Sequence, residues 1–328
     1  MLTLALAGNP NCGKTALFNR LTGVRQSTGT WPGVTVDRKE GRFDHQDRQI
    51  SIIDLPGIYS LVTPQSASLD ETVARDYILS GEADLIINIL DASNLERNLY
   101  LTAQLIEMRV PMIVVLNMMD VVRERGQKID VDALAREIGC PVIPVIAKRS
   151  FGTIVLKNAI VASASDPKTP AARLSYNSIL EEAFVDLSPA LQDLSREHNI
   201  DEHWLALRLL EEDEKALQLV DDEVREHVAT IRSRIEDRAD EEAEMLILDA
   251  RYGFAHALAR KTVLHTRKAS KSLTDKIDNL VLNRWLGVPI FLGIMYVMFM
   301  FAINFASAFI DFFDILAGTV LVDGLTHL

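Results

Sequence analysis

The chain has 328 residues, which is enough for about two domains with a sizeable core. Its net charge of −12 argues against a nucleic-acid-binding surface, because binding phosphate backbones requires clustered lysine and arginine. With only two cysteines, neither a disulfide framework nor a zinc site is predicted. From this cysteine usage we expect the first two thirds of the chain to lie in the cytosol, and no secretory signal peptide opens the sequence.

Residues from Met1 to about Ile160 alternate short apolar runs with helical patterns, which predicts an α/β fold, a mostly parallel sheet with helices on both faces. The apolar runs predicted as strands are Leu2–Ala7, Ile50–Ile53, Leu85–Leu90, Met112–Leu116 and Val142–Ile146. A polar or glycine-containing turn follows each run. Because ligands collect at the carboxyl ends of such strands, these turns are expected to hold the functional residues.

The first apolar run leads into a match to G-x-x-x-x-G-K-[ST], the P-loop that cradles phosphates. The motif consists of Gly8, Asn9, Pro10, Asn11, Cys12, Gly13, Lys14 and Thr15. A predicted helix begins at Ala16, so the loop and the helix N-terminus point their N–H groups at one anion. Lys14 would reach the β- and γ-phosphates, and the Thr15 hydroxyl would bind Mg²⁺. A glycine turn with an incidental lysine is the alternative, and the strand–loop–helix context disfavours it.

The segment from Thr28 to Thr35 holds two glycines and one proline and shows no periodicity, so it is predicted to be a loop. A threonine in such a loop can complete Mg²⁺ coordination when a γ-phosphate is present, and we assign this role to Thr35. The residues expected to face a nucleotide here are Gly33, Val34, Thr35, Val36 and Asp37. Loop threonines are common, so the assignment rests on the position of Thr35 between two other motifs.

The next predicted strand ends in a D-x-x-G match formed by Asp54, Leu55, Pro56 and Gly57. An aspartate at a strand end can hold Mg²⁺ through a water molecule. A glycine with a free N–H can sense a γ-phosphate. The match is weak by itself, and its position after the P-loop and Thr35 decides in its favour.

An N-x-x-D match follows the strand Met112–Leu116, with Asn117, Met118 and Asp120 as the expected contacts. A carboxylate that accepts two hydrogen bonds selects guanine, because the N1–H and the exocyclic amine of guanine are both donors. The segment Ile146, Ala147 and Lys148 follows the last strand, where a backbone N–H can donate to the guanine O6. The two segments together predict GTP or GDP as the ligand.

The ordered set of P-loop, Thr35, Asp54–Gly57, Asn117–Asp120 and Ala147 resembles a Ras-like small GTPase domain. The amino-acid sequences of four segments resemble those of the ferrous iron transport protein B (FeoB) family. Its members are bacterial Fe(II) transporters with a cytosolic GTPase head. These segments are Gly8–Thr15, Trp31–Val36, Asp54–Leu61 and Asp91–Asn98. The resemblance runs essentially from end to end. At Ala147 the family usually has serine, so the backbone role is kept and a hydroxyl is lost.

The resemblance implies a GTP-binding domain over 1–163, a helical regulatory (GDI-like) domain over 164–272 and a membrane-proximal segment over 273–328. We expect hydrolysis to depend on Asn11, Lys14, Thr35 and Gly57. Ras-like enzymes place a glutamine after D-x-x-G to orient the water, and this chain has Ile58 there, which cannot hydrogen-bond. Either hydrolysis is slow or the missing charge comes from elsewhere.

Asn11 resembles the marker of a potassium-stimulated subgroup. The hypothesis is a K⁺ ion held by the Asn11 side chain, phosphate oxygens and the backbone carbonyls from Gly29 to Trp31. A loop-capping role for the Asn11 side chain is the alternative.

Ser163 to Ser175 is rich in Ser, Asp, Pro, Thr and Ala and is predicted to be a linker. Long helical periods follow, and one apolar helix face is predicted from Leu217, Val220, Val224, Val228, Ile231 and Ile235. The acidic runs Glu211–Glu214 and Asp240–Glu242 are interpreted as solvated helix surfaces. Direct capture of Fe²⁺ is the alternative, and interspersed arginines with no histidine ligands disfavour it.

Trp285 to Ile310 contains no charged residue and is long enough to cross a bilayer, so a transmembrane helix is predicted at about 285–310. The stretch is preceded by Lys261, Arg267, Lys268, Lys271, Lys276 and Arg284, and followed by Asp311, Asp314 and Asp323. This asymmetry places its N-terminal side in the cytosol. A buried core helix is the alternative, and it would normally be shorter and show a polar stripe.

Three functions compete. The first is the head of an Fe(II) transporter in the bacterial inner membrane, multi-pass in the full-length protein, in which GTP turnover drives or gates iron passage. The second is a membrane-tethered regulatory switch that controls partner binding. The third, a ribosome- or tRNA-associated GTPase, is disfavoured by the acidic charge and the predicted span. The resemblance implies a lipid bilayer and Fe(II) as partners, and it allows a homo-oligomer and a small cytosolic accessory protein.

Overall fold

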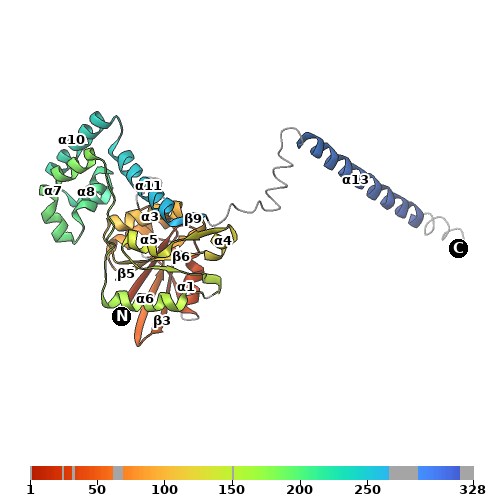
Figure 1. The fold of residues 1–328 in the computed structure, drawn as a ribbon, viewed down its shortest axis with the longest axis horizontal. Coiled ribbons are helices and arrows are strands. Elements are labelled where there is room, and N and C mark those ends of the chain that lie inside the picture. Colours follow the sequence, from red (N-terminus) through yellow and green to blue (C-terminus); the bar gives the residue numbers. More distant parts are fainter. Residues whose placement is uncertain are drawn as a thin grey trace. The chain divides into compact units, whose positions relative to one another are not determined.

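In the computed structural model, residues 2–23, 26–31, 34–61, 69–149, 151–265 and 287–317 are described. The chain divides into two units, Met1–Thr266 and Arg267–Leu328. The first unit contains a sheet with helices and an all-helical region, and the described part of the second is one helix (Figure 1).

The described residues of the first unit form a seven-stranded sheet in the order β2-β3-β4-β1-β5-β6-β8. The strands are β1 (Leu2–Gly8), β2 (Gln26–Thr30), β3 (Asp37–His45), β4 (Arg48–Asp54), β5 (Leu85–Asp91), β6 (Met112–Asn117) and β8 (Val142–Pro144). The pairs β4-β1, β1-β5, β5-β6 and β6-β8 are parallel, whereas β2-β3 and β3-β4 are antiparallel. The predicted mostly parallel sheet is confirmed.

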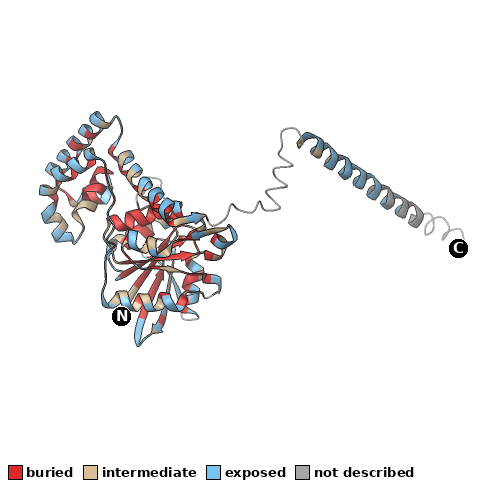
Figure 2. Ribbon diagram, viewed as in Figure 1, coloured by how far each residue is buried: buried red, intermediate tan, exposed pale blue. Residues whose placement is uncertain are grey.

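Helices cover both faces of this sheet. They are α1 (Lys14–Thr22), α2 (Leu69–Ser80), α3 (Leu95–Glu107), α4 (Met119–Glu124), α5 (Val131–Ile138) and α6 (Thr153–Ser165). Successive side chains of a strand point to opposite faces, so Leu4 of β1 packs in the cluster that holds Phe18 of α1 and Ile160 of α6. Ala5 packs in the other cluster, which includes Leu99 of α3. Figure 2 shows the strands of the sheet as a mostly buried layer between the helices.

The loop prediction for Thr28 to Thr35 is wrong in its first part, because Thr28, Gly29 and Thr30 belong to β2. This strand pairs antiparallel with β3, with Gly29 opposite Arg38. All five residues of β2 are exposed, so the strand has no apolar face and no alternation to detect.

The region after the sheet is entirely helical between 178 and 262, as predicted. It contains α7 (Ser178–His198), α8 (Glu202–Leu210), α9 (Glu214–Leu219), α10 (Asp222–Ala239) and α11 (Ala243–Thr262). Four of these helices begin at a side chain that accepts a hydrogen bond from the first turn, which satisfies an otherwise unpaired N–H. The capping residues are Asn177, Asp201, Asp213 and Asp221.

Two predictions about this region are corrected. The single apolar face from Leu217 to Ile235 spans two helices, because Val220 is extended (ψ 151) and Asp221 caps α10. The apolar spacing continues across the break between the two helices, because Val220 and Ile235 are both buried in the same core. The linker also begins later than predicted, because α6 continues to Ser165.

Strand β9 (Val263–His265) follows α11 and returns to the sheet-containing part of the unit. It pairs antiparallel with β7 (Gln127–Ile129), the short strand after α4. Lys261 of α11 adds an ion pair at 2.5 Å to Glu137 of α5. The end of the helical region is therefore attached beside α4 and α5.

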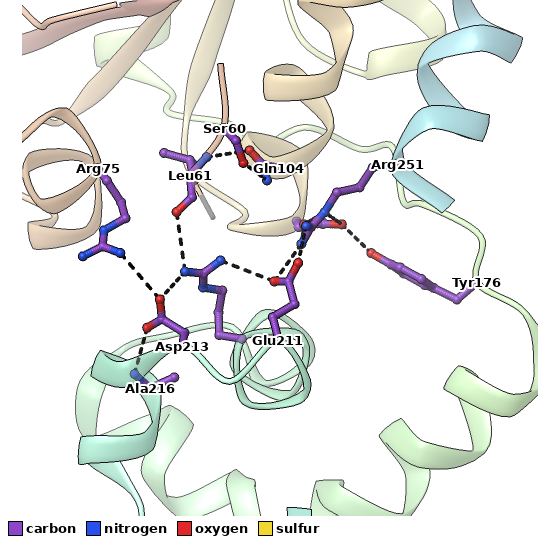
Figure 3. A network of polar contacts seen from close by, with 11 residues as sticks. Ser60, Leu61, Arg75, Gln104, Tyr176, Glu211, Asp213, Ala216 and Arg251 are labelled. Atoms are coloured by element: carbon purple, nitrogen blue, oxygen red, sulfur yellow. Dashed lines mark hydrogen bonds and ion pairs between the residues drawn. The ribbon is translucent and has the colours of Figure 1, made fainter. Parts of the chain in front are cut away.

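A buried ion network joins α3, α8 and α11 (Figure 3). Arg251 is 1% exposed and donates from Nε to both carboxylate oxygens of Glu107 at 3.0 Å. It also pairs with Glu211, and Tyr176 donates to Glu107 at 2.7 Å. Burial alone would lower the pKa of Arg251, but Glu211 and Glu107 raise it well above its ordinary value. The interpretation of Glu211–Glu214 as solvated surface is therefore wrong for Glu211 and also for Asp213, whose largely buried side chain pairs with Arg208, whereas Asp240–Glu242 is exposed.

The described helix of the second unit is α13 (Gly287–Ala317). Its segment Gly287–Phe305 has a mean hydropathy of 2.1 and is not buried in the structure. By length and composition it is the one helix of the described residues that can cross a membrane. Trp285, where the predicted span began, lies outside the described residues.

Replacing Arg251 with methionine should lower the free energy of unfolding of the first unit by about 3–5 kcal/mol, because buried Glu107 loses its ionic partner and keeps only the Tyr176 hydrogen bond, while buried Glu211 keeps only Arg208. Lys168→Met is the matched control, since the Lys168–Asp166 pair (2.9 Å) is solvent-exposed and its loss should cost less than about 1 kcal/mol. Urea denaturation followed by circular dichroism measures both. Equal midpoints for the two variants would show that the buried network is not structurally required.

Candidate functional site

A cavity of about 1010 Å³ lies at the carboxyl ends of β1 and β4. The predicted residues that line it are Pro10, Asn11, Gly13, Lys14, Thr15, Ala16, Thr35, Val36, Asp37, Asp54, Leu55, Pro56, Gly57, Met118 and Lys148. Lys39, Leu69 and Asp70 also line it and were not predicted. The fold thus brings all the segments selected from the sequence to one place.

The loop after β1 has a backbone that requires small residues at its turns. Gly13 has φ 95, and a Cβ atom there would lie 2.2 Å from Nδ2 of Asn117. Asn11 also has a positive φ, 64, and its side chain is exposed. The helix α1 starts directly at Lys14. Its first N–H groups therefore face the cavity, which suits an anion.

Lys14 lies folded over its own loop. Its Nζ donates to the carbonyl oxygens of Gly8 and Asn9, both at 2.9 Å. Burial lowers the pKa of Lys14. An anion in the cavity would oppose that shift, because a nearby negative charge favours the protonated amine.

Thr15 and Asp54 form an oxygen pair at the end of β4. The Thr15 Oγ1 donates to Oδ2 of Asp54 at 3.1 Å. The other carboxylate oxygen, Oδ1, is buried and has no hydrogen-bond partner among the described residues. Burial raises the pKa of Asp54. A hydroxyl and an unsatisfied carboxylate oxygen are the ligands that Mg²⁺ prefers, so these residues fit that ion.

The segment after Asp54 is held against the loop that follows β1. A Cβ atom at Gly57 would lie 2.9 Å from the backbone Cα and N of Pro10, so a side chain there would force the two loops apart. The Ile58 N–H donates to the Gly8 carbonyl at 3.2 Å, and its side chain is 1% exposed in the core. Ile58 therefore presents no side chain to the cavity.

Residues remote in sequence clamp the end of this segment (Figure 3). The Leu61 N–H donates to Oε1 of Gln104 at 2.7 Å, and Gln104 donates to Oγ of Ser60 at 2.9 Å. Arg208 of α8 donates to the Leu61 carbonyl at 3.5 Å and pairs with Asp213. Sequence reasoning missed Gln104 and Arg208, because each lies in an ordinary helix pattern and no motif marks either.

Asn117 connects three loops at the cavity. Its Nδ2 donates to the Cys12 carbonyl at 2.9 Å, and its Oδ1 accepts from the Ala147 N–H at 3.1 Å. The side chain is 5% exposed. Met118 has φ 62 and is the N-cap of α4. Half-buried Asp120 lies in the first turn of that helix and does not line the cavity, so its contact with guanine stays a prediction.

Not all predicted residues line the cavity. Gly8, Asn9, Cys12, Asn117, Ile146 and Ala147 are buried behind it. Trp31 is also buried, and its ring packs against Tyr77 at 5.2 Å. Gly29 lies in β2, so neither Gly29 nor Trp31 lines the cavity, and their role as K⁺ ligands stays a prediction. Gly33 lies outside the described residues.

Comparison with known proteins identifies the family. The family model of ferrous iron transport protein B matches residues 2–160, and the model of the FeoB cytosolic helical domain matches residues 176–264. A solved variant of NFeoB from S. thermophilus, bound to GDP, is 38% identical with a TM-score of 0.72, and the match covers 80% of this chain and all of that one. The chain belongs to the FeoB family.

Two further members of the family agree. The Fe(2+) transporter FeoB of Salmonella choleraesuis (strain SC-B67) is 45% identical over 323 residues, which are 98% of this chain and 41% of that protein. The cytosolic domain of T. maritima FeoB in GMPPNP form is 32% identical with a TM-score of 0.67, covering 80% of this chain and 100% of that one. The chain thus spans less than half the length of the curated FeoB relatives it matches.

Replacing Asn117 with alanine should destabilise the first unit by about 1–3 kcal/mol, because the Cys12 carbonyl and the Ala147 N–H are left buried without a partner. Thermal unfolding without added nucleotide measures the effect. Asn94→Ala is the control, since the Asn94 amide is exposed and bonds only to neighbouring residues. A melting temperature for Asn117→Ala equal to that of the control would contradict the connecting role.

Proposed function

We propose that this chain is a GTPase and that GTP and GDP bind in the cavity at the carboxyl ends of β1 and β4. The observation that carries the proposal is that each of the five segments selected from the sequence contributes at least one residue to the lining of one cavity. The GDP-bound and GMPPNP-form relatives support it.

The phosphates would lie over the loop Gly8–Thr15. The Lys14 ammonium would exchange its two backbone acceptors for phosphate oxygens, and its positive charge stabilises the charge that develops on the transferring phosphoryl group. Gly57 brings its main chain to the same place, where its N–H can donate to a γ-phosphate.

Thr15, Asp54 and Thr35 would hold Mg²⁺, with Asp54 acting through water. The ion would neutralise phosphate charge during hydrolysis. Thr15 and Asp54 are already in contact, and Thr35 lines the same cavity. Thr35 would bind the ion only when a γ-phosphate is present. The conformation of its loop would therefore differ between the GTP and GDP states.

Asp120 would select guanine by accepting from its N1–H and its amine. Asn117 supports this region through its bonds to Cys12 and Ala147. Because the Ala147 N–H is engaged by Asn117, the donor to the guanine O6 is best sought among the remaining N–H groups of the segment, of which Lys148 lines the cavity.

In the cell, we propose that the domain serves as the cytosolic head of an inner-membrane Fe(II) uptake transporter, anchored through α13, and that hydrolysis drives or gates iron passage. Among the described residues no group of three or more His, Cys, Asp or Glu side chains is placed to hold a metal ion. Iron contacts would therefore belong to the remaining length of the protein. A regulatory switch, in which the nucleotide state controls only partner binding, is the competing proposal.

Asp120→Asn should weaken GDP binding by roughly 2–4 kcal/mol, because it replaces a charged acceptor of two hydrogen bonds by an amide that also carries donors. Xanthosine diphosphate, which has an oxygen in place of the amine, should bind the variant better than it binds the parent chain. Calorimetric titration with both nucleotides measures the change. An unaltered GDP affinity would remove Asp120 from the site.

Asn11→Ala tests the proposed K⁺ requirement. Asn11 lines the cavity, whereas Ile58, which stands where Ras-like enzymes place the water-orienting glutamine, is buried in the core. An arginine finger can raise the rate by about 10³–10⁵, and a hydrated K⁺ should contribute less. We expect GTP turnover to be faster in KCl than in matched NaCl, and this difference to vanish in Asn11→Ala.

The same experiment separates the ion from its ligand. Equal rates of the parent chain in both salts would refute the K⁺ proposal. Potassium stimulation that persists in Asn11→Ala would keep the ion and exclude Asn11 as its ligand.

A further inference from the structure

Strand β9 closes the helical region against the part of the unit that carries Asp120. It pairs with β7 so that Lys128 lies opposite Leu264. The pairing continues by one residue, because the Asp130 N–H donates to the Thr262 carbonyl at 2.8 Å. Hydrogen-bonded pairs alternate along an antiparallel ladder, so Lys128 and Leu264 form the next such pair.

Strand β7 is a direct continuation of α4. Only Arg125 and Gly126 separate them, and their N–H groups donate at 3.0 Å to the carbonyls of Val121 and Arg123, which closes the last turn of the helix. A helix of six residues is not stable by itself in water, so α4 depends on its surroundings. The position of β7 therefore bears on the position of α4.

Three supports hold α4. Met119 and Val122 are buried and determine which face of the helix points inward. The end of the helix is held by Arg125, which donates to the Ser93 carbonyl at 2.9 Å, and by its attachment to β7. Within the described residues the one strand that pairs with β7 is β9. An isolated three-residue strand has no stability of its own, so β7 is kept in place by its pairing with β9 and by Ile129, which is buried in the core.

We propose that β9 is a positioning element for guanine selection. By pairing with β7 it holds α4, and with it Asp120, in the orientation in which the carboxylate accepts both guanine donors. The inference rests on the proposed guanine site. The chain runs on from His265 toward α13, so unpairing of β9 by a change in the following residues would lower guanine selectivity at a site in the first unit.

The test compares Leu264→Pro with Leu264→Ala in the full 328-residue chain in detergent micelles. Proline removes the N–H of the pair, whereas alanine keeps it, and the side chain is 45% exposed, so little packing is lost in either. Dissociation constants for GDP and for IDP, which lacks the exocyclic amine, are measured on each protein. We expect the preference for GDP over IDP to fall about tenfold in Leu264→Pro and to stay unchanged in Leu264→Ala.

A second variant, Lys128→Pro, removes the reciprocal donor and should give the same fall. Partial unfolding lowers both affinities together and leaves their ratio unchanged, so the ratio reports on Asp120 and not on the amount of folded protein. An unchanged ratio in both proline variants overturns the inference, as does an equal fall in Leu264→Ala. If the parent chain itself does not prefer GDP, the guanine site is wrong, and that result is distinct from the other two.

Discussion

A parallel sheet brings the ends of its strands to one edge, and the Asn117 side chain joins three of those ends. Its two hydrogen bonds, to the Cys12 carbonyl and from the Ala147 N–H, hold the loops after β1, β6 and β8 at one spacing. These loops have little regular structure of their own. Because the amide is buried, water cannot readily replace either bond, so the relative placement of these three loops depends on this side chain.

The helical region and the sheet belong to one compact unit. Its core is continuous with one face of the sheet. Charged side chains also fix the orientation of the packed elements. Arg208 donates to the Leu61 carbonyl, and Arg75 of α2 lies 3.7 Å from Asp213. Buried ion pairs contribute little net stability, yet removing one partner is costly. Such contacts therefore specify how α8 is oriented toward the segment after Gly57.

The parts of the site that sequence reasoning found share a physical reason. The residues expected to contact phosphate or guanine lie within a few positions of a strand end, as in Gly8–Thr15. A short sequence motif is therefore enough to detect them. Strand β2 was missed because an exposed edge strand has no apolar face. The break between α9 and α10 at Val220 was missed because the spacing of apolar residues continues across it. Gln104 and Arg208 act across 43 and 147 residues, where no local pattern exists.

At the position after Gly57, the main chain and the side chain of one residue have different roles. Ile58 uses its main chain, donating to the Gly8 carbonyl, while its side chain fills the core. The residue therefore holds two loops together and takes no part in orienting water. Lys14 shows the complementary case, since its ammonium is satisfied by backbone carbonyls until an anion competes for it. With no water-orienting side chain at position 58, the proposed hydrolysis depends on positioned charge, and the exposed Asn11 at the cavity is the residue through which the K⁺ proposal would supply it.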